Sequence, residues 1–88
     1  MSITGSPDTA PYRVGYPFAD TIGGLTAAFT IAAALASPPG NRGRWIDVSM
    51  LESTIATMGW VVSNYLVAGK IPEAGGNDNF TASPSGTF

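Results

Sequence analysis

Asp20 is the acidic residue whose position in the chain is most suggestive of chemistry. It stands where an extended, proline-bearing stretch, 12–19, gives way to a run of small and apolar residues, 21–36. An acid at the start of a helix lies beside unpaired backbone N–H groups and the positive end of the helix dipole, which stabilise the anion by about 0.3–2 kcal/mol. Such a carboxylate can act as a nucleophile. The simpler interpretation is that Asp20 only caps the helix, since Asp is a preferred N-cap residue.

The remaining chemistry is limited by residues that the chain lacks. It contains neither cysteine nor histidine, which removes disulfides, thiolate nucleophiles, imidazole bases and the usual zinc sites. We therefore expect no metal site, and any chemistry to rest on carboxylates. A strand accounts for Asp47 and a helix cap for Glu52, while Glu73 and Asp78 are expected in solvated loops. None is spaced as a second catalytic acid, so a glycosidase-like pair finds no support.

The residues around Asp20 predict an extended stretch that leads into a buried helix. Residues 1–19 read as an irregular arm and an extended segment, rich in Pro, Gly, Ser and Thr. The helix is expected over about 20–36, and it is apolar nearly all round, as buried helices are. Gly23 and Gly24 each cost about 1 kcal/mol in helix propensity. We therefore expect another backbone or a ligand to approach closely there, with packing as the simpler interpretation.

The second half of the chain predicts a short strand and a second helix. Residues 44–48 alternate in polarity, as a strand does. Ser49 and Glu52 have the spacing of a capping box, which opens a helix over about 49–68. The fold class is thus an α/β fragment, mainly α. We expect one partial domain over 1–88 with an arm and extended segment, a helix–strand–helix core and a loop tail: 1–19, 20–69 and 70–88.

Composition bounds the size of the core and the class of partner. At 88 residues, with 44% hydrophobic and 11% charged residues, the chain has more apolar surface than a core of its own size covers. We therefore expect a homo-oligomer. A net charge of −2 with four scattered basic residues offers no footprint for nucleic acid or anionic lipid.

Membrane insertion and secretion are also not expected from the sequence. The apolar run 22–36 is too short, and too rich in Gly and Thr, to be a confident membrane span. The first residues are polar and do not resemble a signal peptide, so a cytoplasmic location is expected.

The order of these motifs resembles that of a known protein family. The segments around Asp20 are RVGYPFADTIGGL at 13–25, an Ala-rich helix, GRWIDVSMLE at 43–52 and the tail NFTASPSGTF at 79–88. This order is similar to that of the family III CoA-transferases, the CaiB/BaiF family, which includes formyl-CoA and carnitine-CoA transferases and the α-methylacyl-CoA racemases. Family members are several times longer, so the chain resembles an internal fragment of a Rossmann-like CoA-transferase domain.

The resemblance implies a covalent mechanism. In the family an Asp attacks an acyl-CoA thioester to give an acyl-aspartyl anhydride, and CoA then returns to form an aspartyl-CoA thioester. The resemblance puts this role on Asp20, and it puts Met50 beside the reacting acyl group; a core methionine is the simpler interpretation of Met50. It implies acyl-CoA as substrate, a carboxylic acid as acceptor, no tightly bound cofactor and an interlocked homodimer.

Several alternatives remain open at this point. The resemblance implies that most CoA-binding residues lie upstream of Asp20, so the complete protein is expected to be an enzyme and this chain alone to be inactive. The racemase branch of the family pairs its Asp with an upstream His, and this chain has none, but the chain does not separate transferase from racemase. A stand-alone helical self-association module without catalysis is a second hypothesis, and a membrane-associated helical hairpin is a third.

Overall fold

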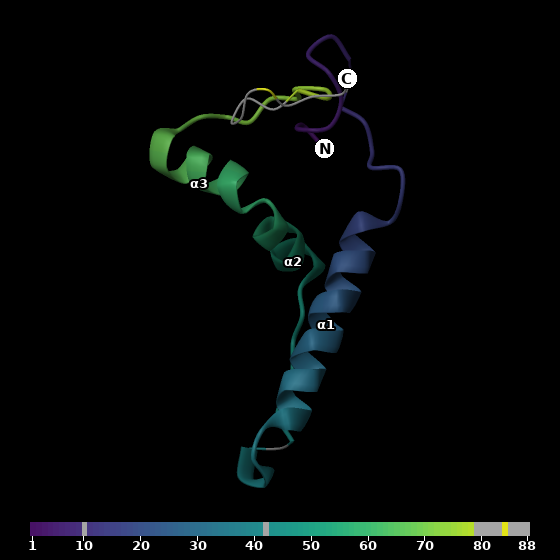
Figure 1. Ribbon diagram of the computed structural model, residues 1–88, viewed down its shortest axis with the longest axis vertical. Helices are drawn as coiled ribbons and strands as arrows, with labels where there is room; N and C mark the ends of the chain where they lie inside the picture. The colour runs from purple at the N-terminus through teal and green to yellow at the C-terminus, as the bar shows by residue number, and fades with distance from the viewer. Residues whose placement is uncertain (10, 42, 79–83, 85–88) are drawn as a thin grey trace. The chain divides into compact units, whose positions relative to one another are not determined.

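The computed structural model describes residues 1–9, 11–41, 43–78 and Pro84. The described part of the chain is mainly helical, as predicted (Figure 1), with these elements: α1 Phe18–Ala36, the 3-10 helix η1 Pro39–Asn41, α2 Met50–Thr57 and α3 Gly59–Ala68. The tail 79–88 carries part of the family resemblance and the end of the predicted loop. Apart from Pro84, this tail lies outside the described residues.

Two compact units make up the chain, Pro17–Gly59 and Met1–Tyr16 together with Trp60–Phe88. The first unit contains Asp20 and most of the residues that concern function. The single partial domain over 1–88 stays a prediction, since compact units within a chain this short are not in themselves domains.

Helix α1 begins before Asp20, which corrects the N-cap interpretation. Pro17 occupies the N-cap position without a side-chain hydrogen bond, and α1 starts at Phe18. The backbone N–H of Thr21 donates to the Pro17 carbonyl at 3.0 Å, and its hydroxyl donates to the same oxygen at 2.9 Å. Because Pro17 fixes its own φ, it starts the helix without a capping side chain. Asp20 therefore lies inside the first turn, where its charge still favours the helix dipole.

The prediction that α1 is buried is wrong for this chain taken alone. Gly23 is the one buried residue of α1, and no hydrophobic side chain is buried anywhere in the described ranges. Large side chains of α1 are exposed, among them Leu25 at 62%, Phe29 at 77% and Leu35 at 69%. The reason is that α2 and the segment leading to it cover only one side of the helix.

By length and composition, α1 is able to cross a membrane. The helix has 19 residues and a mean hydropathy of 1.5, with 6% of the stretch buried. The run 22–36 was predicted to be too short for a membrane span because its start was taken at Ile22. The helix starts at Phe18 and is therefore longer than that run. Core helices of soluble proteins have the same length and composition, so this property alone is weak support for a membrane helix.

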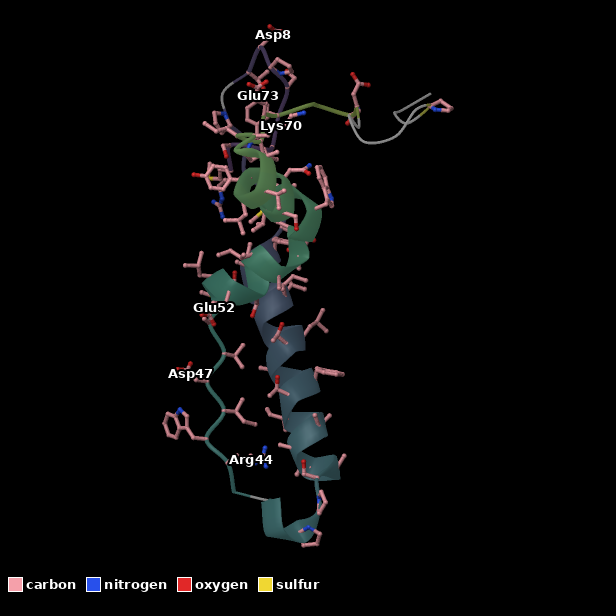
Figure 2. All side chains as sticks on the ribbon, turned by 90° about the vertical axis from the view of Figure 1, so that its left-hand side faces the viewer. Asp8, Arg44, Asp47, Glu52, Lys70 and Glu73 are labelled. Carbon is pink, nitrogen blue, oxygen red and sulfur yellow. The ribbon has the colours of Figure 1, made fainter. Side chains whose placement is uncertain are left out.

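The strand predicted over 44–48 is wrong within the described residues. Residues 44–49 have no regular secondary structure, because a β-strand needs a second strand to pair its backbone groups and the described part of the chain supplies none. The segment runs back along α1 (Figure 2). A cavity of about 380 Å³ lies between them, lined by Thr30, Ala33, Ala34 and Ser37 on one side and by residues 44–47 on the other.

The second predicted helix is two helices. Ser49 caps α2 as predicted, its hydroxyl oxygen accepting the backbone N–H of Glu52 at 3.2 Å. The helix then breaks at Met58, which has φ −97° and ψ 28° and donates its N–H to Ile55 at 3.0 Å. Gly59 follows directly and begins α3. The high backbone freedom of glycine makes this the weakest point of a continuous helix.

The second unit pairs the N-terminal arm with the segment after α3. The N–H of Gly76 donates to the carbonyl of Gly5 at 2.7 Å, and the N–H of Tyr12 donates to the carbonyl of Thr4 at 2.9 Å. Gly76 has φ +62°, a conformation that favours glycine and lets the backbone turn. The arm is therefore held in place by hydrogen bonds rather than by regular structure.

Candidate functional site

Asp20 is an exposed acid in the first turn of α1. The first backbone N–H groups of any helix lack partners within the helix, and they point toward its N-terminal end. A carboxylate in this turn is open to a substrate that approaches the helix end. The geometry can therefore present a nucleophile beside hydrogen-bond donors that would stabilise a developing oxyanion.

Gly23 is where α2 comes closest to α1. A Cβ added at Gly23 would lie 3.2 Å from Cγ of Met50, 3.9 Å from its Cα and 4.0 Å from its Cβ. An added Cβ at Gly24 would meet nothing within 4 Å. The expectation that packing explains a glycine in this helix is thus confirmed for Gly23. Gly24 has no such explanation among the described residues.

Met50 is brought onto the face of α1 that carries Asp20. Residues three apart in a helix share a face, so Asp20 and Gly23 are neighbours on α1. Met50, the first residue of α2, packs against Gly23 with the near part of its side chain. The side chain is nevertheless 53% exposed. Met50 is therefore neither fully buried in a core nor a free surface residue.

Hydrogen bonds fix the start of α2 in place. The carbonyl of Ser49 accepts two bonds from Ser53, one from the N–H at 3.0 Å and one from the hydroxyl at 2.8 Å. Ser53 is 7% exposed and is the one buried polar residue among those described. Ser53 was not predicted as a packing residue. The available signal was a small side chain three residues after Met50, because a small residue at that spacing allows close helix packing and its hydroxyl can bond within its own helix.

Asp47 and Glu52 form a second group of carboxylates in this unit. Figure 2 labels both: Asp47 lies within the segment 44–49, and Glu52 lies in the first turn of α2. Both are exposed and line a cavity of about 270 Å³ together with the α1 residues Thr26 and Thr30. The two threonine hydroxyls bond backbone carbonyls one turn earlier, at 2.8 and 2.7 Å. These acids are therefore the competing location for carboxylate chemistry.

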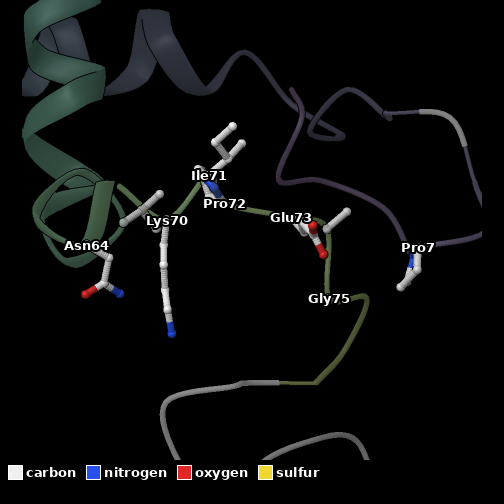
Figure 3. Close-up of a pocket in the computed structure, with 9 residues that line it drawn as sticks. Pro7, Asn64, Lys70, Ile71, Pro72, Glu73 and Gly75 are labelled. Carbon is white, nitrogen blue, oxygen red and sulfur yellow. The ribbon is translucent and has the colours of Figure 1, made fainter. Parts of the chain in front are cut away.

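The other unit holds a cavity of about 330 Å³ (Figure 3). Pro7 lines it together with Val61, Asn64 and residues 70–75. Lys70 and Glu73 are its charged residues, and both are exposed. Glu73 is thus a solvent-facing loop residue, as predicted. The cavity contains no residue of the unit that carries Asp20.

Comparison with known proteins covers the whole chain. The model of a family described as CoA-transferase family III matches residues 1–88. Among solved structures, a CaiB/BaiF family protein from Brucella suis is similar, with a TM-score of 0.85 and 32% identity over 99% of this chain. The chain covers 23% of that structure.

Three curated relatives are similar at the level of sequence. The chain is 35% identical over 96% of its length to the succinate–glutarate CoA-transferase of Agrobacterium fabrum. It is 30% identical to the succinyl-CoA–D-citramalate CoA-transferase of Chloroflexus aurantiacus, and 36% identical to the acetyl-CoA:oxalate CoA-transferase of Acetobacter aceti. The chain spans 21%, 22% and 23% of the lengths of these relatives.

Proposed function

This chain belongs to CoA-transferase family III, and we propose that it carries the nucleophile of a reaction that moves CoA between carboxylic acids. The observation that carries the proposal is the exposed carboxylate of Asp20 in the first turn of α1. The family model matches all 88 residues of the chain, Asp20 included. We assign the nucleophile to Asp20 and a contact with the acyl group to Met50.

The proposed reaction proceeds through two covalent states of Asp20. A carboxylate oxygen of Asp20 attacks the thioester carbonyl, the carbon–sulfur bond breaks, and CoA leaves as a thiolate from a mixed anhydride. The thiolate then attacks the carbonyl carbon of Asp20, which releases the donor acid and leaves an aspartyl-CoA thioester. The acceptor carboxylate attacks that thioester in turn. CoA leaves, returns to the acceptor carbonyl, and restores the free carboxylate of Asp20.

The remainder of the site is proposed to lie in a longer chain. The 88 residues span 21–23% of the lengths of the relatives. The three relatives are named as CoA-transferases, which favours transfer over racemisation. We propose that the complete protein, rather than this segment alone, binds the acyl-CoA substrate and the acceptor acid.

A small dicarboxylic acid is the acceptor that we propose. Succinate, glutarate, citramalate and oxalate, which occur in the names of the relatives, are all dicarboxylic acids. The complete protein is expected to form new thioesters when succinyl-CoA is mixed with glutarate or citramalate. Chromatography of the CoA esters measures this exchange. Hydrolysis of succinyl-CoA without a new thioester would contradict CoA transfer, and equal exchange into acetate would contradict the substrate class.

A self-association module is the second candidate function, because the chain exposes large apolar side chains on α1, α2 and α3. They include Leu25, Phe29 and Leu35 on α1, Leu51 and Ile55 on α2, and Leu66 and Val67 on α3. The described part of the chain buries no hydrophobic residue that would give it a core. Stability must then come from association.

We predict that the 88-residue chain is a homodimer or a larger oligomer whose contacts bury more than about 1,000 Å². The exposed faces of α1 and α2 supply the apolar surface, and burying such surface stabilises by about 25 cal/mol per Å². Light scattering at micromolar concentration measures the mass. A stable monomer that melts cooperatively would refute association.

A further inference from the structure

We propose that Gly23 is a positioning residue, which sets where the Met50 side chain lies beside Asp20 and thereby the acyl groups that the site prefers. The inference rests on the proposed function, since it concerns the acyl group transferred to Asp20. It adds a third residue to the two given roles above, Asp20 and Met50. It also gives Gly23 a role that its neighbour Gly24 lacks.

The close contact at Gly23 acts on one side chain. The atom nearest to an added Cβ is Cγ of Met50, at 3.2 Å, whereas the backbone of Met50 lies at an ordinary contact distance of 3.9 Å. A methyl group at Gly23 therefore requires Cγ to move by a few tenths of an ångström while the backbone of α2 can stay. The Ser49 and Ser53 hydrogen bonds hold that backbone in place. The adjustment falls on the rotamer of Met50.

The displaced side chain lies on the face of α1 that carries Asp20. Asp20 and Gly23 share a face of α1, and Met50 covers that face at Gly23. An acyl group joined to the carboxylate of Asp20 starts from this face. Met50 is 53% exposed, and its flexible, polarizable side chain can adapt to apolar groups of different shape. Its position therefore limits the length of acyl group that fits beside Asp20.

The substitutions Gly23→Ala and Gly24→Ala form a matched pair for testing this role. Both gain the same helix propensity, but only the first meets Met50. The measurement, in the complete protein that carries this segment, is the ratio of kcat/KM for succinyl-CoA to that for glutaryl-CoA, which differ by one methylene. A ratio taken within one preparation is independent of the folded fraction, so a merely structural defect leaves it unchanged.

Gly23→Ala is expected to change this ratio at least about threefold, since one methylene in an apolar site is commonly worth tenfold or more. Gly24→Ala is expected to leave it within about twofold. Met50→Ala removes Cγ, so adding Gly23→Ala to it should change nothing further. Met50→Ala alone should also alter the ratio, which keeps the test valid if Gly23→Ala does not fold.

Two results would overturn the inference while leaving CoA transfer through Asp20 intact. One is an unchanged ratio in a folded Gly23→Ala variant or, if that variant does not fold, in Met50→Ala. The other is a Gly23→Ala effect that is the same with Met50 present or truncated, since this would show that the two residues act independently. An Asp20→Asn variant that keeps full activity would overturn the proposed function and this inference together.

Discussion

Replacing Asp20 by Asn in the complete protein is expected to lower CoA transfer by at least about a thousandfold, because the neutral amide is not a nucleophile toward a thioester. Asn has nearly the same size as Asp, and Asp20 is exposed in this chain. The loss of one charge from the first helical turn should cost about 1 kcal/mol or less. Exchange rate and melting temperature are measured on the same preparation.

Asp47→Asn is the matched control for this experiment. Asp47 is another exposed acid of the same unit, so the substitution removes an equal charge from a residue without an assigned role. It is expected to keep activity within a few-fold. Full activity in Asp20→Asn, or a greater loss in Asp47→Asn, would move the chemistry away from Asp20.

The isolated 88-residue chain is expected to exchange CoA no faster than a control without protein. Holding the thioester about 3–3.5 Å from the nucleophile supplies roughly 7–11 kcal/mol of the barrier reduction, which is the largest effect that we predict. In this chain Asp20 is exposed, and the cavities described above do not include it. The measurement is chromatography of CoA esters after incubation with succinyl-CoA and glutarate.

Circular dichroism on the same sample provides the control, because it reports whether the helices have formed. A helical preparation without exchange supports the need for the rest of the protein. Turnover by the isolated chain well above background would refute it, and it would mean that α1 and α2 bind the thioester by themselves.

Local features of the fold could be predicted from the sequence. Ser49 and Glu52 predict a helix start, and the 3.2 Å hydrogen bond confirms it, because such a cap depends on residues only three positions apart. The need for a close contact at the Gly23–Gly24 pair is likewise a local argument. It is confirmed at Gly23, whose added Cβ would lie 3.2 Å from Met50.

Features that depend on distant or absent partners could not be predicted. Residues 44–48 alternate in polarity as a strand does, but no described residue pairs with them, so no strand forms. The apolar α1 reads as buried, yet only Gly23 is buried, because the sequence indicates what needs cover and not whether cover is present. The break at Met58 was missed for another reason, since the apolar stripe predicts one continuous helix and Gly59, the local signal for a break, was not given weight.

The position of Asp20 could likewise be predicted only in part. Its neighbourhood at a helix start is predictable, but the start itself moves to Phe18 because Pro17 takes the N-cap position. Asp20 changes from the predicted N-cap to a first-turn residue. Met50 is a candidate by resemblance, and its packing on Gly23 becomes visible only when two helices are placed together.

Trapping the covalent intermediate tests the central claim most directly. The complete protein is incubated with succinyl-CoA, quenched with hydroxylamine, digested and analysed by mass spectrometry. Hydroxylamine attacks an activated aspartyl carbonyl and leaves a hydroxamate in place of the carboxylate. We predict the hydroxamate on Asp20, and its loss in the Asp20→Asn variant. A hydroxamate on Asp47 or Glu52 instead, the two acids that line the cavity beside α2, would contradict the account and reduce Asp20 to a residue that stabilises its helix.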